Sequence, residues 1–208
     1  MILSNRAIHK ALDDGRLIIT PEPRPRFPDP NGPADACPYG TCSVDLRVGR
    51  EFSIPKGNRP FILNVNEGEF SDYFNAENFD TDVREPGQCF VLPPKGVALV
   101  TTVETVEFPI IPGKKALAGR IEGRSRWARC GLLIHFTAPT IHAGWKGPIT
   151  LELCNLGTVR LGIEPGARIC QLLIEDVAGA PFHNESVFQD QETPGGRRKG
   201  KKTRRGRL

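Results

Sequence analysis

The residues of this sequence that are best suited to chemistry lie between positions 122 and 152. In the segment EGRSRWARCG, Arg124, Arg126 and Arg129 surround Ser125 directly after a predicted strand. Guanidinium groups bind phosphate oxygens through paired hydrogen bonds, and a hydroxyl supplies one more donor. These residue types at this spacing predict a phosphate-binding segment, with a solvated basic loop as the alternative.

A carboxylate interrupts the strand-like segment GPITLELCN at residues 147–155. Ile149, Leu151 and Leu153 alternate along it and share one face of an extended chain, which leaves Glu152 on the opposite face. A carboxylate that is buried without a partner costs several kcal/mol or shifts its pKa. Glu152 therefore indicates either a sheet with one solvated face or a functional acid.

An aromatic turn separates these two segments. The sequence TAPTIHAGWKG at residues 137–147 predicts a tight, glycine-containing β-turn, and Trp145 in it is suited to stacking on a ring or a sugar. Phosphate-binding arginines, an aromatic side chain and a strand carboxylate thus occur in one short stretch. This grouping favours a functional site over a solvated surface.

Motifs for metal-dependent or nucleophilic catalysis are incomplete in this sequence. Cys37 and Cys42 have a spacing that zinc sites permit, but no second Cys/His pair follows at a fitting distance. The tripeptide HNE at 183–185 has no P-C-x-x-C partner, and the sequence has neither G-x-S-x-G nor a P-loop. His135 lies in the apolar run GLLIHFTA, which predicts a core histidine with satisfied hydrogen bonds. We therefore expect no zinc.

Short strands joined by turns dominate the predicted elements. Ser4 is a predicted N-cap, and Ile8 and Leu12 lie on one face of a short helix that ends near Gly15. The proline-rich stretch 21–33 predicts an extended loop. Strands are predicted at residues 43–49, 60–65, 88–92, 97–107, 116–122, 131–137, 149–154, 158–163 and 168–175. Such a pattern is typical of an all-β barrel or jelly roll.

Composition predicts one globular domain, or at most two small ones, in the cytoplasm. The chain has 208 residues, of which 38% are hydrophobic, with 22 Gly and 19 Pro. No apolar run approaches the length of a membrane span, and the N-terminus lacks the layout of a signal peptide. We therefore expect reduced and mostly buried cysteines at positions 37, 42, 89, 130, 154 and 170.

The net charge of +4 comes from the C-terminal end. Residues 197–208, RRKGKKTRRGRL, hold eight of the 28 basic residues and no acid, so 20 basic and 24 acidic residues remain elsewhere. The body of the chain, at about −4, is not a nucleic-acid-binding surface by composition. We expect a disordered tail, and nucleic acid is a possible partner only through this tail.

Five stretches, taken in order, resemble the dCTP deaminase family within the trimeric dUTPase-like superfamily. They span about residues 1–176 and read MILSNRAIHKALDDGRLII, CSVDLRVG, LAGRIEGRSRWARCGLLIHFTA, GWKGPITLELCN and EPGARICQL. The segment VFQDQETPGGR also resembles the tail with which that family covers its nucleotide. We therefore expect a dUTPase-like domain at 1–178, a covering segment at 179–196 and the basic tail at 197–208.

The resemblance implies a mainly β protein, a distorted β-barrel with a short N-terminal helix and few other helices. It also implies a homotrimer with active sites between subunits, and zinc-independent hydrolytic deamination of dCTP to dUTP and ammonia. Glu152 would be the general acid/base, and Ser125 with the backbone carbonyl of Ala138 would orient the water. Mg²⁺ would bind together with the triphosphate.

The resemblance also implies a set of substrate-binding residues. The arginines and Ser125 would hold the triphosphate, and Trp145 would pack near the deoxyribose and help to exclude a 2′-hydroxyl. Gln171 and Gln191 match positions on the base side and the phosphate side of the nucleotide. The whole set is Arg124, Ser125, Arg126, Arg129, Ile141, His142, Trp145, Thr150, Leu151, Gln171 and Gln191.

Three places depart from the family pattern. Ile141-His142 stands where much of the family has Ile-Asp, whose carboxylate bonds to the 3′-hydroxyl and, in the related triphosphatases, activates water. Arg126 replaces a second serine, and Val187-Phe188 replaces a common Lys-Tyr pair. These changes leave the preference between mono- and triphosphate open.

Alternatives to a dCTP deaminase that releases dUTP follow from the same residues. A bifunctional enzyme would also cleave the triphosphate and give dUMP and pyrophosphate. A dUTPase without deaminase activity is disfavoured by His142. A non-catalytic nucleotide- or nucleic-acid-binding relative is disfavoured by the presence of Glu152, Ser125 and Arg129. No residue decides whether modified cytosines are accepted or whether dTTP inhibits.

Overall fold

The computed structural model describes residues 1–33, 35–57, 73, 77–184, 186, 188–191, 193 and 194. The strand expected at 60–65 and the basic tail at 197–208 lie outside these residues. The described helices are α1 (Asn5–Asp13) and α3 (Ser125–Ala128). The described strands are β1 (Ile18–Thr20), β2 (Val44–Pro55), β3 (Phe79–Val83), β4 (Phe90–Leu92), β5 (Val97–Glu107), β6 (Leu117–Gly123), β7 (Leu132–Leu133), β8 (Thr140–Ile141), β9 (Lys146–Asn155), β10 (Leu161–Ile163) and β11 (Arg168–Asp176).

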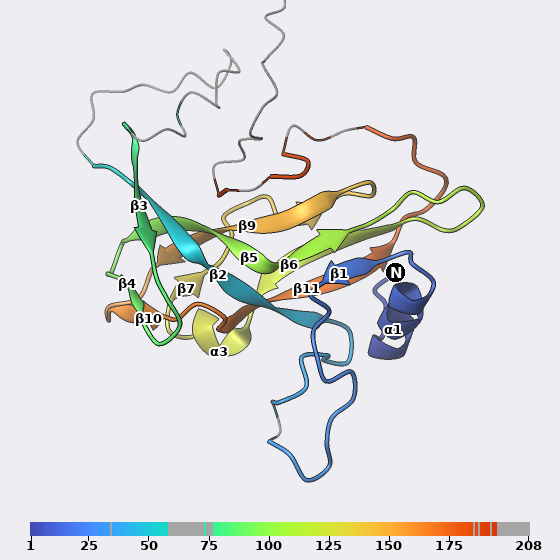
Figure 1. Ribbon diagram of the computed structural model, residues 1–208, viewed down its shortest axis with the longest axis horizontal. Coiled ribbons are helices and arrows are strands. Elements are labelled where there is room, and N and C mark those ends of the chain that lie inside the picture. The colour runs from blue at the N-terminus through green and yellow to red at the C-terminus, as the bar shows by residue number, and fades with distance from the viewer. Residues whose placement is uncertain are drawn as a thin grey trace, which may run out of the picture.

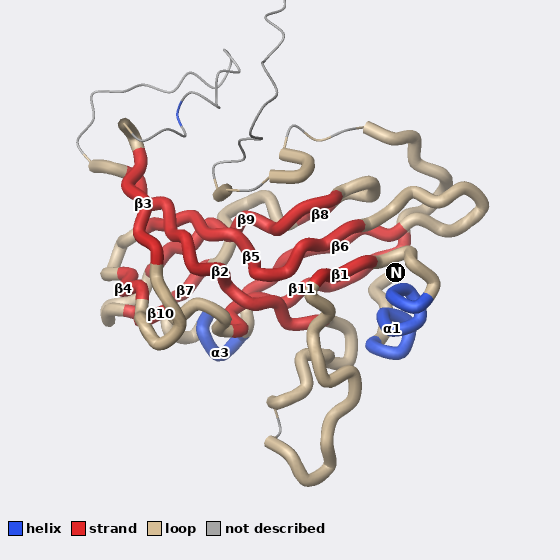
Figure 2. The backbone as a smooth tube through the Cα atoms, in the orientation of Figure 1, coloured by secondary structure: helices blue, strands red, loops and turns tan. Residues whose placement is uncertain are grey.

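Antiparallel strands are the dominant regular structure of the described molecule (Figures 1 and 2). Within the described residues, nine strands form one sheet in the order β7-β9-β5-β2-β11-β6-β8, with β1 paired to β5 and β3 to β2, while β4 and β10 form a separate pair. The first residues of β2 pair with β11, and its later residues pair with β5 and β3. This long strand therefore joins two halves of a strongly curled sheet. The expected mainly β, barrel-like fold with a short N-terminal helix is confirmed.

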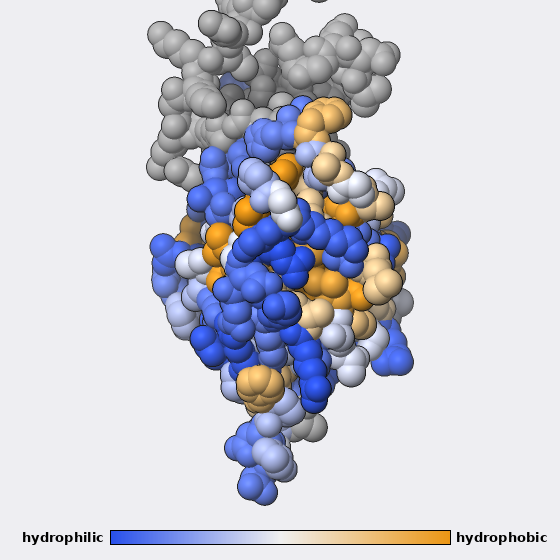
Figure 3. All heavy atoms as spheres, turned by 90° about the vertical axis from the view of Figure 1, so that its right-hand side faces the viewer, coloured by the Kyte–Doolittle hydropathy of each residue, from blue (hydrophilic) through white to orange (hydrophobic). Residues whose placement is uncertain are grey.

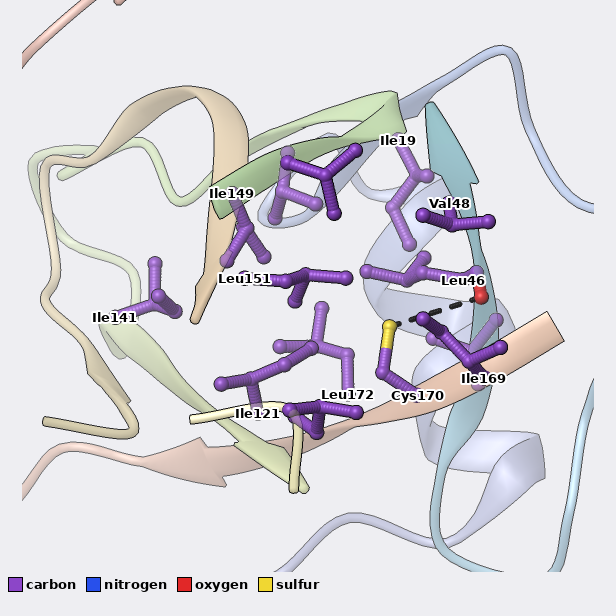
Figure 4. Packing of buried hydrophobic residues seen from close by; sticks show 14 of the residues in the cluster. Ile19, Leu46, Val48, Ile121, Ile141, Ile149, Leu151, Ile169, Cys170 and Leu172 are labelled. Atoms are coloured by element: carbon purple, nitrogen blue, oxygen red, sulfur yellow. Dashed lines mark hydrogen bonds between the residues drawn. The ribbon is translucent and has the colours of Figure 1, made fainter. Parts of the chain in front are cut away.

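Alternating apolar side chains fill the space between the two halves of the sheet (Figure 4). Leu46 of β2, Val100 of β5, Leu151 of β9 and Leu172 of β11 are each completely buried. The Cys170 thiol lies beside them and donates to the Leu46 carbonyl oxygen at 3.7 Å. Because side chains alternate along a strand, β9 and β11 each keep a second row of side chains outside this core.

The N-terminal helix begins at the capping residue that the sequence predicts. The Ser4 hydroxyl accepts a hydrogen bond from the Ala7 backbone N–H at 3.3 Å. Ile8 and Ala11 are completely buried in the core cluster. The helix ends just before Gly15, which has a φ of +68°. Both predicted ends of this helix are confirmed.

A charged side chain lies between the two longest strands. Glu104 of β5 is completely buried. Its carboxylate accepts hydrogen bonds from Arg47 Nε at 2.6 Å and from the Arg47 backbone N–H at 2.8 Å. A buried carboxylate requires such a partner, and the pairing of β2 with β5 changes register close to this contact. The ion pair thus links β2 and β5 close to the point where their pairing changes register.

The strand expected at 131–137 is wrong beyond its first residues. β7 contains only Leu132 and Leu133, which pair with the end of β9. The Gly131 carbonyl accepts a hydrogen bond from the Leu156 N–H at 2.8 Å, and beyond β7 the contact with β9 continues only through single hydrogen bonds, such as that from the Glu152 N–H to the Ile134 carbonyl. β10 is likewise shorter than the strand expected at 158–163. The pattern misses β1, β3 and β8 because these strands are short and mostly exposed.

The cysteines are free, but most of them are not buried, which corrects the expectation from the sequence. Cys154 and Cys170 lie in strands and are buried, and Cys37 is half-buried. The remaining three are exposed because they lie in turns and loops, and these are Cys42, Cys89 and Cys130.

The surface near α1 is mostly hydrophilic, with hydrophobic side chains between the polar ones (Figure 3). Among the described residues, no helix has both the length and the apolar character needed to cross a membrane.

Candidate active site

The phosphate segment, residues 124–129, contains one helical turn, α3, which the sequence pattern does not predict. The Arg124 backbone N–H donates to the Ile169 carbonyl at 3.3 Å. Trp127 packs against the core, and its Nε1–H donates to the Arg168 carbonyl at 3.3 Å. These contacts fix α3 against the first residues of β11.

Two arginines of the phosphate segment are paired with carboxylates. Arg124 Nη1 lies 3.4 Å from Asp45 Oδ2. Arg126 Nη2 lies 3.2 Å from Asp35 Oδ2. The first pair is largely buried and the second is exposed, so a ligand can compete for Arg126 far more easily than for Arg124.

The other two polar side chains of the phosphate segment are open to a ligand. Ser125 and Arg129 are both exposed. Within the described ranges, the Ser125 hydroxyl makes no hydrogen bond and the Arg129 guanidinium forms no ion pair. Both can therefore bind phosphate oxygens without breaking an existing contact.

Asp45 is a site residue that the sequence pattern does not reveal. The alternation in SVDLRVG predicts an outward-facing aspartate, but Asp45 is only 9% exposed. Arg124 and Arg168 lie 3.4 and 3.8 Å from its carboxylate, and its backbone N–H donates to the Pro38 carbonyl at 2.8 Å. Burial raises the pKa of Asp45 above its ordinary value, and the two guanidinium groups act in the opposite direction. Its neighbours in the sequence give no sign of this, because both arginines are distant from it in the sequence, at the start of α3 and in β11.

Glu152 lies on the outer row of β9 and is half-buried. Its backbone N–H donates to the Ile134 carbonyl at 2.9 Å, and its carboxylate Oε2 accepts the Phe136 backbone N–H, also at 2.9 Å. A hydrogen bond to a charged acceptor is stronger than one between neutral groups, so it orients the carboxylate toward the loop that follows β7. Ala138, expected to help orient water, is exposed in that same loop.

The aromatic turn is held by hydrogen bonds within the turn and by two backbone hydrogen bonds to Phe108. The Trp145 N–H donates to the His142 carbonyl at 3.1 Å, and Nε1–H of the indole donates to the Gly147 carbonyl at 3.1 Å. Gly144 adopts a φ of +86°, which a glycine tolerates without strain. His142 is exposed and lines a cavity of about 500 Å³ that Phe182 also lines.

The C-terminal segment lies along the start of β9. Gln189 Nε2 donates to the Gly144 carbonyl at 3.1 Å, and the Asp190 N–H donates to the Lys146 carbonyl at 2.8 Å. Gln191, almost fully buried, donates through Nε2 to the Pro148 carbonyl at 2.8 Å.

One more contact brings this segment close to the candidate acid. The Thr150 hydroxyl donates to the Pro194 carbonyl at 3.4 Å, two residues before Glu152 on the same side of β9. The C-terminal segment, including Gln191, is thereby held against the strand that carries Thr150 and Glu152.

The remaining expected residues lie elsewhere. Gln171 pairs in register with Asp45 on β2, and its Oε1 accepts the Ser43 hydroxyl at 3.2 Å. The side chains of Ile141 and Leu151 belong to the hydrophobic core, so only their backbone groups are available to a ligand.

His135 is not the satisfied core histidine that the sequence predicts. Its Nδ1 is buried without a hydrogen-bond partner in the described structure, and its Nε2 lies 3.7 Å from Glu122. The cause is the early end of β7, which leaves His135 at the rim of the sheet rather than inside it.

The structure divides the expected site between two places in the chain. Glu152, Thr150, the aromatic turn and the C-terminal segment gather at β9, whereas the phosphate segment and Gln171 lie at α3 and β11. In Figure 1, α3 and the described C-terminal residues lie on opposite sides of the sheet. Among the described side chains, no hydrogen bond or ion pair joins the phosphate segment to Glu152.

The donor types of the site suit phosphate better than a metal ion. The phosphate segment offers guanidinium and hydroxyl groups, which bind phosphate oxygens, whereas Mg²⁺ takes carboxylate and phosphate oxygens and water. Over the described ranges, no group of three or more His, Cys, Asp or Glu side chains is arranged to hold a metal ion.

Comparison with known proteins identifies the family. A family model described as dCTP deaminase-like matches residues 2–177. The chain belongs to this family. Its relatives include the dCTP deaminase of Natronomonas pharaonis, which is 37% identical over 200 residues that cover 93% of this chain and 92% of the relative. The dCTP deaminase of Hamiltonella defensa is 36% identical over 188 residues, which cover 88% of this chain and 89% of the relative.

Another member of the dCTP deaminase-like family has a different product in its name. The "dCTP deaminase, dUMP-forming" of Methanobrevibacter smithii is 33% identical over 175 residues, which cover 84% of this chain and 79% of the relative. Among solved structures, the 2′-deoxycytidine 5′-triphosphate deaminase of Agrobacterium tumefaciens shares the fold, with a TM-score of 0.53 and 19% identity. That match covers 83% of this chain and 47% of the other.

Proposed function

We propose that this protein is a cytoplasmic enzyme of pyrimidine deoxynucleotide metabolism that deaminates dCTP to dUTP and ammonia. The observation that carries the proposal is the Glu152 carboxylate, which a dCTP deaminase-like chain holds half-buried on β9 with the Phe136 N–H as its donor. A strand carboxylate oriented by one backbone donor keeps a free oxygen for a water molecule and a substrate nitrogen.

The proposed reaction adds water to C4 of the cytosine ring and expels ammonia. Glu152 takes a proton from the attacking water and delivers it to N3. It then transfers the proton of the new C4 hydroxyl to the amine, so that the C4–N bond breaks, ammonia leaves and the C4 carbonyl forms. General acid–base catalysis of this kind contributes about 10²–10⁴-fold in rate. The Ser125 hydroxyl and the Ala138 carbonyl orient the water, which is consistent with the exposure of both residues.

Substrate binding is proposed to rest on the phosphate segment and the aromatic turn. Ser125 and Arg129 are open to triphosphate oxygens, and Arg124 is set in place by Asp45. Mg²⁺, when bound, would neutralise part of the triphosphate charge and be held by the phosphate oxygens themselves. His142 replaces the family's aspartate and can hydrogen-bond the sugar 3′-hydroxyl.

The complete site is proposed to form between subunits of a homotrimer. The lack of a hydrogen bond or ion pair between the phosphate segment and Glu152 among the described residues is consistent with this assembly, in which a single nucleotide would contact both. In such a trimer one subunit would supply Glu152 and its neighbour would supply Ser125 and Arg129.

A bifunctional reaction is the second candidate. The dUMP-forming relative at 33% identity favours it, since relatives with either product stand at comparable distances from this chain. Cleavage of the triphosphate would then follow deamination and release pyrophosphate.

The test is a product assay with dCTP and Mg²⁺ that separates ammonia, uracil nucleotides and pyrophosphate. Glu152→Gln removes the proton-transfer group with little change in size, and we expect ammonia release to fall about 10²–10⁴-fold. The matched control is Glu51→Gln, which changes a half-buried glutamate of β2 that lies outside the candidate site.

The products discriminate between the candidates. Ammonia with intact dUTP supports a deaminase that stops at dUTP, and ammonia with dUMP and pyrophosphate supports the bifunctional enzyme. Absence of ammonia with the wild-type protein, or an unaffected rate in Glu152→Gln, would refute the proposed mechanism and leave a non-catalytic nucleotide-binding protein as the alternative.

A further inference from the structure

Arg126 is the one position of the phosphate segment where this chain adds a charge to the family pattern, because it replaces a serine. In the structure the Arg126 guanidinium has an acidic partner. Its Nη2 lies 3.2 Å from Asp35 Oδ2, and the two residues are 91 positions apart in the sequence. The extra positive charge in the phosphate segment is therefore matched by a negative charge from the loop that precedes β2.

Asp35 is placed there by a second arginine. Arg168, the first residue of β11, donates through Nη1 to the Ala36 carbonyl at 3.2 Å and through Nη2 to the Asp35 carbonyl. Both donors hold the loop backbone and leave the Asp35 carboxylate directed at Arg126. The Ala36 N–H also donates to the Pro33 carbonyl at 3.0 Å, which closes a turn at this point. The loop is thus fixed by its backbone, and its charged group is presented to the phosphate segment.

The pair has the properties of a replaceable contact. The side chains of Asp35 and Arg126 are 49% and 59% exposed. Exposed ion pairs contribute little to folding and exchange with other charged partners. The Arg126 guanidinium, first through its hydrogen bond and then through its charge, holds the pKa of Asp35 below its usual value, so the carboxylate is charged at neutral pH.

We propose that Asp35 is an internal competitor for the phosphate segment, occupying Arg126 in the free protein until a polyphosphate displaces it. The proposal rests on the proposed role of residues 124–129 in phosphate binding. A polyphosphate carries more charge than one carboxylate and can bind Ser125 and Arg129 at the same time, so it displaces Asp35 where a less charged ligand does not. Asp35 thereby weakens triphosphate binding and reserves Arg126 for highly charged ligands.

The test measures binding of inorganic tripolyphosphate to the full-length protein by calorimetry, at low ionic strength and with Mg²⁺. Asp35→Asn keeps the shape of the side chain and removes its charge, and we expect its Kd for tripolyphosphate to fall about three- to fivefold. The gain should shrink at high salt, because the contact is exposed. Asp29→Asn is the matched control: it removes a carboxylate of the same loop whose partner is the Asn31 N–H, and we expect no change in Kd.

A double-mutant cycle assigns the effect to Arg126. In the Arg126→Ser background, Asp35→Asn should change the Kd for tripolyphosphate less than twofold, because the contact it relieves no longer exists. An equal gain in that background, an unchanged or higher Kd for Asp35→Asn alone, or no binding of tripolyphosphate by any variant overturns the proposal.

The same variants separate this inference from the proposed enzyme function. For dCTP turnover, Asp35→Asn should lower KM and leave kcat nearly unchanged, since the contact acts on binding and not on the proton transfers. If the wild-type protein releases no ammonia but the tripolyphosphate cycle gives the expected result, the deaminase function fails and the role of Asp35 stands. If dCTP is deaminated and the cycle shows no coupling between Asp35 and Arg126, the deaminase function stands and the proposed role of Asp35 fails.

Discussion

Single residues of this protein owe their chemical state to neighbours that are distant in the sequence. Glu152 keeps its orientation through one backbone N–H, whereas Asp45 is covered by two guanidinium groups and Glu104 is enclosed entirely. Of these three carboxylates, Glu152 has the fewest fixed contacts, and it lies on β9 beside the loop that follows β7. That difference is consistent with the proposed role of Glu152 in proton exchange, whereas Glu104 and Asp45 hold segments of the fold together.

His9 provides a residue-scale prediction about stability and pH. It is buried in α1, its ring meets Tyr39 edge-on at 4.5 Å, and its Nε2 has no hydrogen-bond partner within the described structure. Burial, and then the charge of Arg26, lowers the pKa of His9 below 6.5, while Asp13 and Glu22 oppose this shift.

The sign of the effect follows from proton binding. Below pH 6.5 the unfolded chain protonates His9 before the folded protein does, so the free energy of unfolding falls as pH falls, by at most about 1.4 kcal/mol per pH unit. Urea unfolding between pH 7.5 and 5.5 measures it, and His9→Phe should lose this slope relative to wild type. His183→Phe, at an exposed histidine, is the control and should keep the slope. Identical slopes in all three proteins would contradict the prediction.

At the scale of elements, the connection from α3 to β7 determines where the phosphate segment lies. This connection crosses the end of β9 in backbone contact: a Cβ on Gly131 would lie 2.3 Å from the Gly157 nitrogen. Gly131 also has a φ of +89°, which other residues rarely adopt. Both conditions require glycine here, and both come from the packing of segments that are separate in the sequence.

Gly131→Ala should therefore destabilise the protein and disturb the phosphate segment together. We expect a loss of about 1–3 kcal/mol, because the added methyl group meets backbone atoms and the conformation is strained. Thermal unfolding measures the loss, and a raised KM for dCTP reports the displacement of Arg129. Gly57→Ala, where no atom lies within 4 Å of the added Cβ, is the control and should differ little from wild type. Wild-type stability in Gly131→Ala would show that the crossing is not tight in solution.

For the molecule as a whole, the candidate site draws on two groups of elements, β9 with the C-terminal segment and α3 with β11. The phosphate segment and the β9 carboxylate have no hydrogen bond or ion pair between them among the described residues. The proposed homotrimer places these two groups from neighbouring subunits on one nucleotide. Such an arrangement makes activity a property of the assembly.

Mixed assemblies test this arrangement. Glu152→Gln and Ser125→Ala should each be inactive alone, and subunits of the two, unfolded together and reassembled, should recover activity. If each site takes Glu152 from one subunit and Ser125 from another, random mixing restores about a quarter of the sites. Each variant reassembled with itself is the control. No recovery in the mixed sample, with trimers present by light scattering, would show that both residues act within the same chain.

The sequence by itself determined the long core strands, the N-terminal helix and the order of the motifs, but not the short strands β1, β3 and β8. Alternation of apolar residues is a local property, so it predicted β5 at its observed bounds and β11 almost so, and Ser4 predicted the start of α1. The residue types around Ser125 and at Glu152 pointed to the family, to which the matched residues 2–177 assign the chain. Prediction failed at β7 and at His135, where a backbone crossing ends a strand that the apolar pattern would continue.

Only the tertiary structure decided which charges meet. Asp45 has the sequence pattern of a solvated residue, but in the structure it is buried, and Arg124 at the start of α3 and Arg168 of β11 lie against its carboxylate. Asp35 faces Arg126 across 91 positions because Arg168 holds the loop backbone in place. Periodicity and capping depend on residues within a few positions of one another, whereas ion pairs depend on strand register and loop packing. That is why the sequence revealed the reactive groups and the fold revealed how they are partnered.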